Sequence, residues 1–327
     1  MLRELACTRL RGVLVALGLA LVLGCAEARV QEAPRSRVAI ARAETIMIVD
    51  APLTPAWLYP EGRIDYNTIE LLLHTAVAGA MGVETEDEAW NLLLTPGDRV
   101  GILVDVEGIQ PHDPLLEALV RQIMDRGVPM RNIIIFAGEE SALFRAGYDI
   151  SGRAPGVQVM ASDDRGYRRG LTRIVLDYTT KLVNLSRLRV HPQIGMHAAL
   201  ANSLAVVPYV DRERLLREPE LLPEVAAKAT IRRMTVLHIL DALSPAFRQS
   251  ESGRGYDTWS YNGVLASTDP VAVDAVARRI LEQQIAREQA NGGACALLEV
   301  PYIEPAAGEY RLGVADLEQI EIVRTGP

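Results

Sequence analysis

The chain has 327 residues, of which 49% are hydrophobic and 23% are charged, so it can bury a sizeable core and has the composition of a globular protein. A net charge of -8 and a pI near 5.3 exclude a general attraction to nucleic acid or to anionic lipid. Arginines 165, 168, 169 and 173 form only a local basic cluster. We therefore expect no nucleic-acid partner.

The N-terminus has the pattern of a bacterial export signal. Arg3, Arg9 and Arg11 precede an apolar run over residues 13–23 that is short for a membrane-spanning helix. The following Val22-Leu23-Gly24-Cys25 resembles a lipobox, in which Cys25 carries the lipid. We expect residues 1–25 to be the signal and the protein to be lipid-anchored on the periplasmic face of the cell envelope. An ordinary cleaved signal, giving a secreted or periplasmic protein, is the alternative.

Residues 26–43 mix Ala, Glu, Arg, Pro and Ser without periodicity, which indicates a flexible tether. The sequence therefore predicts a single domain over residues 44–327. Because Cys7 would leave with the signal, Cys295 would be the one thiol left beside the lipidated Cys25. No iron–sulfur cluster or cysteine-ligated zinc site is expected from one chain.

The first half of the expected domain alternates strands and helices. A short β-rich run at residues 45–49 is followed by a helical apolar spacing over 66–81, a buried strand at 99–106, a helix at 114–126 and a strand at 132–137. The last three form a β-α-β unit, whose crossover implies a parallel sheet.

The second half continues with candidate strands at residues 158–161, 173–176 and 181–188 and a helix at about 196–205. Residues 225–243 begin with helical spacing, but 236–240 fit either state. A strand at 262–266 leads into a helix that extends to about 288, and a strand closes the chain at 317–323. The predicted fold class is α/β, with a mostly parallel or mixed sheet and helices on both faces.

The most informative segment is Ser267-Thr268-Asp269-Pro270-Val271-Ala272-Val273-Asp274-Ala275, at a strand-to-helix switch. Pro270 suits the first helical turn, so Asp269 fits the N-cap position. The structural alternatives to a functional role are that Asp269 only caps the helix and that Asp274 only pairs with Arg278.

Four segments resemble the bacterial and archaeal family known as domain of unknown function 362. They are the strand at 99–105, where Leu103, Val104 and Asp105 replace a usual Lys-Pro-Asn; residues 183–202; the Ile239-Leu240-Asp241-Ala242-Leu243 run; and the segment at 267–275. In the second segment His191 and Asn202 match, Arg189 replaces one family lysine and Ala201 replaces the other. The resemblance implies an α/β fold and a set of positions rather than a reaction.

These positions would meet where ligands bind open α/β sheets, outside the carboxyl ends of the strands. We expect a polar cleft with His191 and Asp269 as catalytic residues if the protein is an enzyme, which the sequence leaves open. Ligand contacts would come from Arg189, Asn202, Asp241 and Asp274. A divalent metal on His191, Asp241 and Asp269 is one option, and His197 is a further candidate. Structural roles remain open for each residue.

The sequence contains no dinucleotide fingerprint, phosphate loop, metalloprotease motif or nucleophile elbow. The leading hypothesis is an exported α/β protein that binds a small anionic ligand or a divalent metal. The rival hypothesis is a non-catalytic envelope accessory protein on a degenerate family scaffold. The sequence does not identify a protein partner.

Overall fold

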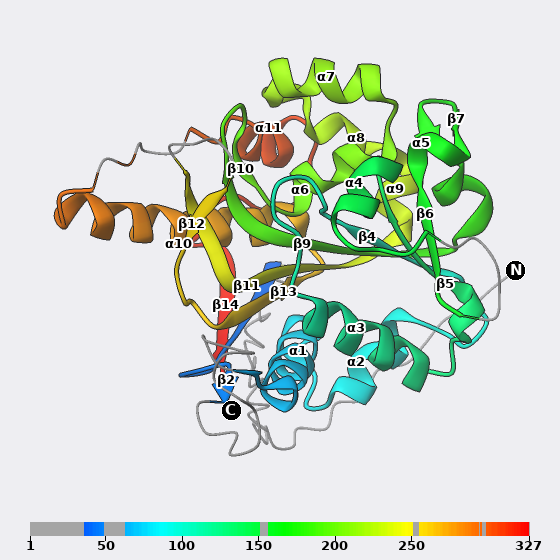
Figure 1. The fold of residues 1–327 in the computed structure, drawn as a ribbon, viewed down its shortest axis with the longest axis horizontal. Coiled ribbons are helices and arrows are strands. Elements are labelled where there is room, and N and C mark those ends of the chain that lie inside the picture. Colours follow the sequence, from blue (N-terminus) through cyan, green and yellow to red (C-terminus); the bar gives the residue numbers. More distant parts are fainter. Residues whose placement is uncertain are drawn as a thin grey trace, which may run out of the picture. The chain divides into compact units, whose positions relative to one another are not determined.

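A large mixed sheet is the centre of the protein, whose computed structural model describes residues 36–48, 63–150, 156–250, 255–293, 295 and 299–326 (Figure 1). Its strand order is β14-β1-β13-β11-β9-β4-β5-β6, with β10 paired to β9 and β12 to β11. The strands are β1 (Ser36–Arg42), β4 (Val100–Val104), β5 (Ile133–Ala137), β6 (Gln158–Ala161), β9 (Lys181–His191), β10 (Gly195–His197), β11 (Thr235–Gln249), β12 (Tyr256–Thr258), β13 (Gly263–Ser267) and β14 (Ile320–Thr325).

Most strands along this order run parallel. β11, β9, β4, β5 and β6 form a continuous parallel set, and β1 pairs in parallel with β14. β13 alone on this path runs in the opposite direction, because it is antiparallel to both β1 and β11. The carboxyl ends of β1 and β14 therefore lie at the same edge of the sheet as those of β9 and β4. The predicted fold class is confirmed.

Helices cover both faces of the sheet, as Figure 1 shows. They are α1 (Tyr66–Met81), α2 (Glu86–Leu93), α3 (Asp113–Asp125), α4 (Glu140–Arg145), α5 (Ser162–Arg165), α6 (Ala199–Asn202), α7 (Tyr209–Arg217), α8 (Pro223–Ala227), α9 (Ala229–Met234), α10 (Pro270–Ala290) and α11 (Ile303–Gly308). β2 (Met47–Ile48) pairs antiparallel with β3 (Arg63–Ile64), and a short hairpin joins β7 (Tyr167–Arg168) to β8 (Leu171–Thr172).

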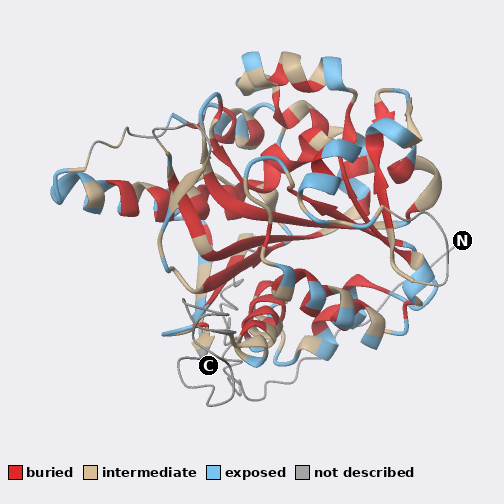
Figure 2. Cartoon of the chain, viewed as in Figure 1, coloured by how far each residue is buried: buried red, intermediate tan, exposed pale blue. Residues whose placement is uncertain are grey.

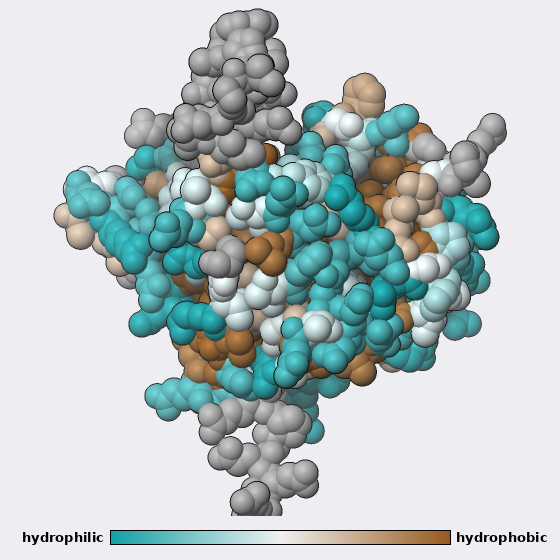
Figure 3. Space-filling view, turned by 90° about the horizontal axis from the view of Figure 1, so that it is seen from below, coloured by the Kyte–Doolittle hydropathy of each residue, from teal (hydrophilic) through white to brown (hydrophobic). Residues whose placement is uncertain are grey.

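Two apolar clusters lie on opposite faces, because successive side chains of a strand point to opposite sides. Ile102 and Val104 pack with α1, α2 and α3, whereas Leu103 packs with α6, α8, α9, α10 and α11. Figure 2 shows the resulting pattern, with the central strands buried and the outer faces of the helices exposed. Viewed from the side of α1 to α3, the surface is largely hydrophilic with smaller hydrophobic areas (Figure 3).

Helix α1 shows how the sequence sets an element. Its side chains at positions 69, 72, 73, 76, 77 and 80 are buried on one face, the spacing expected for an amphipathic helix. Asp65 caps the start by accepting a hydrogen bond from the Asn67 N–H, and Gly82 ends the helix in the left-handed conformation. The prediction of a helix over 66–81 is confirmed at both ends.

Several predicted elements differ from the structure. The expected strand at 173–176 is a π-helical turn, Ile174–Tyr178, and residues 196–205 contain the end of β10, the four-residue α6 and a 3-10 turn, Ser203–Val206. The ambiguous 236–240 segment lies within β11. Buried strands and buried helices both present continuous apolar runs, so pairing with β9 and β13 decided this case.

The predicted tether is wrong for its last residues, because Ser36–Arg42 forms β1 inside the sheet. Val38, Ala39, Ile40 and Ala41 are buried, and β1 lies between β13 and β14. The domain therefore begins near Arg35 rather than residue 44. A strand with only four apolar residues gives no periodic signal of its own. The predicted signal and the lipidation site Cys25 lie outside the described residues.

None of the helices in the described part of the chain combines the length and the apolar character that crossing a membrane would require.

Candidate functional site

The candidate site lies where the connections of the parallel sheet diverge. From β4 the chain continues through α3 to β5 on one side, whereas from β9 it continues through α6 to α9 and reaches β11 on the other side. The two connections pack on opposite faces of the sheet. β4 and β9 are neighbours, so their carboxyl ends border a topological switch point, the usual ligand site of open α/β sheets.

A buried ion pair connects the ends of these two strands. Arg189 on β9 donates from Nε to Asp105 Oδ2 at 3.2 Å and from Nη2 to Oδ1 at 3.4 Å, and Asp105 directly follows β4. Both residues are at most 2% exposed. Burial alone would raise the pKa of Asp105, but the charge and hydrogen-bond interactions with Arg189 and His197 together outweigh burial and hold that pKa well below its usual range. The pair therefore stays ionised at neutral pH.

Two histidines on the β9–β10 hairpin border this pair. His197 stands opposite Arg189 in the register, and its Nδ1 lies 3.0 Å from Asp105 Oδ2. The ring of His191 is 6.2 Å from that of His197, centroid to centroid. Gly195 permits the hairpin, since its φ is +79° and a Cβ there would lie 1.8 Å from the Glu299 carbonyl oxygen.

Both histidines are neutral at neutral pH. Burial, followed by His197 and Arg189, lowers the pKa of His191 to about 3, and burial also lowers the pKa of His197. His191 Nδ1 accepts a hydrogen bond from the Gln193 N–H at 3.3 Å, which assigns the proton of the neutral ring to Nε2. His191 can thus donate one hydrogen bond from Nε2.

The rim of the site is formed by the loop after β4 and by β12. Glu107 keeps part of its surface in solvent, yet its surroundings desolvate it and, together with Asp105, raise its pKa. Its backbone carbonyl accepts from Arg189 Nη2. Gly108 has a φ of +91°, and a Cβ there would come within 3.1 Å of the Tyr256 hydroxyl. The Tyr256 ring lies 5.8 Å from the Arg189 guanidinium.

A second buried arginine extends this polar edge to β5 and β6. Arg212 donates to Asp163 Oδ1 at 2.7 Å and to the Tyr167 hydroxyl at 2.6 Å, and it lies 3.8 Å from Glu139. Glu139 and Asp163 follow the ends of β5 and β6. Gly138 lies close to this arginine, and a Cβ there would lie 2.7 Å from Arg212 Nη1, so the guanidinium would have to shift.

The Asn202 side chain holds strands and a helix together beneath the site and does not line the site itself. Its Nδ2 donates to the carbonyl oxygens of Leu103 and Leu185, and to Asn184 Oδ1 at 2.6 Å. Asn184 in turn donates to Ala199 O and to His238 Nδ1. The three polar side chains are buried, and they join β4, β9 and β11 to α6.

Asp241 belongs to a separate polar group. It is fully buried on β11, where Oδ2 accepts from the His112 backbone N–H at 2.6 Å and contacts His112 Nδ1 at 2.7 Å, while Oδ1 accepts from the Leu243 N–H. Burial would raise the pKa of Asp241, but the hydrogen bonds from His112 and the charge interactions with His112 and Arg187 together outweigh it and lower that pKa. This carboxylate holds the loop before α3 against β11.

Asp269 is the N-cap of α10, as its structural alternative predicted. Oδ1 accepts from the Val271 and Ala272 N–H groups, and Oδ2 accepts from the Ser36 hydroxyl and the Val314 N–H. Both oxygens are therefore used to join α10, β1 and the segment before β14. The proposed catalytic role of Asp269 is not supported by this geometry.

Asp274 neither lines the site nor pairs with Arg278. It is fully buried and accepts from the Ala199 and Leu200 N–H groups at 2.8 and 3.0 Å, which caps α6. Burial raises the pKa of Asp274 to about 7, although the two backbone hydrogen bonds oppose this. Arg278 instead pairs with Glu282 at 2.7 Å.

The structure thus brings together Arg189 and His191 from the predicted set. Across the described residues, no group of three or more His, Cys, Asp or Glu side chains is arranged to hold a metal ion, so the set His191, Asp241 and Asp269 is not assembled. Sequence reasoning named Asp105 as a position of the family resemblance, and it missed Arg212 and Tyr256. Acidic residues directly after the predicted strands were the available signal for Glu139 and Asp163.

The comparisons identify a family and leave the chemistry open. No curated protein matches the chain. The family model described as a domain of unknown function, number 362, matches residues 115–279, about half of the sequence. The matched part contains β9, β10, β11, β13 and the first half of α10, and therefore Arg189, His191 and His197. The chain belongs to the domain of unknown function 362 family.

Proposed function

We propose that this protein binds a small anionic ligand at the carboxyl ends of β4 and β9 while it is anchored to the cell envelope through Cys25. The observation that carries the proposal is a neutral, partly exposed His191 beside a fully compensated Asp105–Arg189 pair at the switch point. A ligand carboxylate or similar oxygen would accept a hydrogen bond from His191 Nε2.

The protonation state favours an anion over a metal. Metal ions bind the unprotonated nitrogen of an imidazole, and the Gln193 N–H already occupies Nδ1 of His191. The remaining nitrogen carries the proton, which suits an oxygen acceptor. Because Asp105 cancels the Arg189 charge, a ligand would meet a polar surface with little net charge. The Arg189 guanidinium therefore positions the hairpin more than it binds the ligand.

The same pKa limits the chemistry that His191 can perform. A ring with a pKa of about 3 is unprotonated at neutral pH and is a weak base, so it is poorly suited to general acid or base catalysis. Binding and orientation of a ligand are the roles this geometry supports best. An enzymatic activity would need its proton donor or acceptor from another group, and Glu107, with its raised pKa, is the nearest candidate.

Calorimetric titration with malonate, a small dicarboxylate, tests the proposal. We expect His191→Ala to weaken malonate binding by about tenfold, because one hydrogen bond to a charged acceptor contributes roughly 1.5–3 kcal/mol. His74→Ala is the matched control, since His74 lies on α1 and pairs with Glu86. Unchanged binding by His191→Ala, in a protein with native circular dichroism, would remove the proposal.

The envelope anchor has its own test. The arginines before residue 13, the apolar run and Cys25 support lipidation. We expect the wild-type protein to sediment with membranes and Cys25→Ala to be released into the soluble periplasmic fraction. Equal membrane recovery of both proteins would contradict the anchor.

One observation favours the rival function, an accessory protein without catalysis. Asn202, Asp241, Asp269 and Asp274 all use their polar atoms inside the fold. The family positions could therefore be kept for folding alone. Retention of a metal in stoichiometric amount after dialysis, measured by elemental analysis, would argue against this rival. A metal-free protein that co-purifies with a partner, and that does not bind malonate, would favour it.

A further inference from the structure

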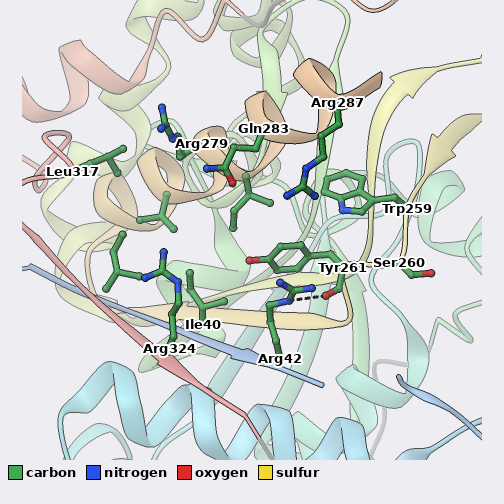
Figure 4. A pocket seen from close by; sticks show the side chains of 13 residues that line it. Ile40, Arg42, Trp259, Ser260, Tyr261, Arg279, Gln283, Arg287, Leu317 and Arg324 are labelled. Carbon is green, nitrogen blue, oxygen red and sulfur yellow. Dashed lines mark hydrogen bonds between the residues drawn. The ribbon is translucent and has the colours of Figure 1, made fainter. Parts of the chain in front are cut away.

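A hollow lies between α10 and the carboxyl ends of β1 and β14, about three strands away from His191 in the sheet order (Figure 4). It measures about 230 Å³. In the figure, Gln283 and Arg287 project from α10, while Arg42 and Arg324 approach from the strands on the other side. We call this the arginine hollow. Its lining is Ile40, Arg42, Trp259, Ser260, Tyr261, Val276, Arg279, Ile280, Gln283, Arg287, Leu317, Ile322 and Arg324.

Among the residues that the structure describes, the lining contains four arginines and no acidic side chain. Within the described part of the chain, Arg279, Arg287 and Arg324 form no ion pair, whereas the adjacent Arg278 pairs with Glu282 at 2.7 Å. Arg279 also borders a neighbouring hollow that contains Glu282, so it belongs to the rim. Arg42 is fixed in place, because its Nε donates to the Tyr261 carbonyl at 2.9 Å.

The base of the arginine hollow is aromatic and apolar. The Arg42 guanidinium lies 4.1 Å from the centre of the Tyr261 ring, a cation–π arrangement. The rings of Tyr261 and Trp259 meet edge to face at 6.3 Å. Ile40, Val276 and Ile280 complete the apolar base. Cations thus surround a surface on which a ring or an aliphatic group could pack.

The cation cluster is unusual for this protein. The chain carries a net charge of -8, yet these like charges are gathered where no carboxylate of the described residues lines the hollow, which raises their mutual repulsion. An anion in the hollow would relieve it. The guanidinium group is planar and binds phosphate oxygens through two parallel hydrogen bonds, so a cluster of several suits a multiply charged phosphate.

We propose that the arginine hollow binds a small phosphate-bearing anion, held by Arg42, Arg287 and Arg324, with a neighbouring ring or aliphatic part on Trp259 and Tyr261. The hollow is too small for a nucleic-acid strand, and the acidic surface elsewhere disfavours one. A soluble pyrophosphate compound and a phospholipid headgroup share this chemistry. The inference uses residues that are independent of the His191 site.

The test is calorimetric titration of the full chain with pyrophosphate. We expect the double variant Arg287→Gln/Arg324→Gln to bind pyrophosphate at least about tenfold more weakly than the wild type, because two charge-assisted contacts are lost. Arg131→Gln/Arg233→Gln is the matched control. It removes the same charge from exposed residues that lie outside the hollow, and it should change affinity less than about threefold.

A parallel titration with glycerophosphoglycerol, the deacylated headgroup of an anionic phospholipid, separates the two sources. Tighter binding of pyrophosphate identifies a soluble ligand, and tighter binding of glycerophosphoglycerol identifies a lipid headgroup. Either result supports the site if the hollow variant loses binding and the control does not. Equal affinities of wild type and hollow variant, or no binding of either probe, would overturn the proposal.

Discussion

Two arginine-centred regions lie at the same edge of the sheet, and they differ in whether the positive charge is paired with a carboxylate. At the switch point, Arg189 is 1% exposed and is fully paired with Asp105. In the arginine hollow, Arg287 and Arg324 are exposed and no carboxylate lines the hollow. A buried charge without a partner costs several kcal/mol, whereas an exposed one is stabilised by water. The charge of Arg189 is therefore neutralised by an ion pair inside the fold, whereas the charges of Arg287 and Arg324 stay available to a ligand.

The largest expected effect on stability comes from breaking the buried Asp105–Arg189 ion pair. Asp105→Asn leaves Arg189 buried without its counter-charge, so we expect a loss of about 3–5 kcal/mol in the free energy of unfolding, measured by urea denaturation. Glu321→Gln is the control, because it breaks the more exposed Arg37–Glu321 pair and should cost at most about 1 kcal/mol. Similar losses in both variants would show that the burial of Arg189 does not decide its energetics.

A smaller effect is expected from Asp269→Ala. The change removes the cap of α10 and the hydrogen bonds to Ser36 and Val314, so the free energy of unfolding should fall by about 1–2 kcal/mol or slightly more. Malonate binding by the folded fraction should stay unchanged, because Asp269 is structural. A stable variant that has lost malonate binding would restore the catalytic hypothesis.

The pH dependence sharpens the comparison at the site itself. The pKa of His191 is about 3 in the folded protein and near 6.5 when unfolded, so between these values the unfolded chain binds the proton. Stability should therefore fall as the pH drops below about 6.5. We expect His191→Gln to reduce that fall by roughly 1 kcal/mol per pH unit, measured by urea denaturation at several pH values. His197 and His238 also have lowered pKa values, and they contribute equally to the pH dependence of the wild type and of the variant. Identical slopes would mean that His191 is accessible to protons in the folded state.

The smallest effect belongs to the arginine hollow. Arg287→Gln removes an exposed charge without an ion pair, so the free energy of unfolding should change by no more than about 0.5 kcal/mol. We expect a slight increase in the free energy of unfolding, because the substitution relieves the repulsion between like charges. Thermal unfolding at low and high salt measures it. A loss comparable to that of Asp105→Asn would place Arg287 among the residues that hold the fold together.

Local sequence patterns predicted much of the fold. Three local patterns predicted their elements correctly: the apolar spacing of α1, the Pro270 start of α10 and the β-branched run of β5. Hydrophobic periodicity and helix caps involve only neighbouring residues, so they can be recognised in the sequence. The sequence missed β1 and left part of β11 open. These strands are specified by their partners in the sheet, and the pairings of β1 with β13 and of β11 with β9 join residues more than fifty positions apart along the chain.

By itself, the sequence determined the α/β class, the family and the placement of Arg189 and His191 at a strand end. Only the tertiary structure decided which acids are used by the fold. Asp241, Asp269 and Asp274 lie, like Asp105, in the segments that resemble the family, but each meets backbone N–H groups brought to it by distant segments. A carboxylate's role depends on the donors and charges around it in space, and these are fixed only when the sheet and its helices have assembled.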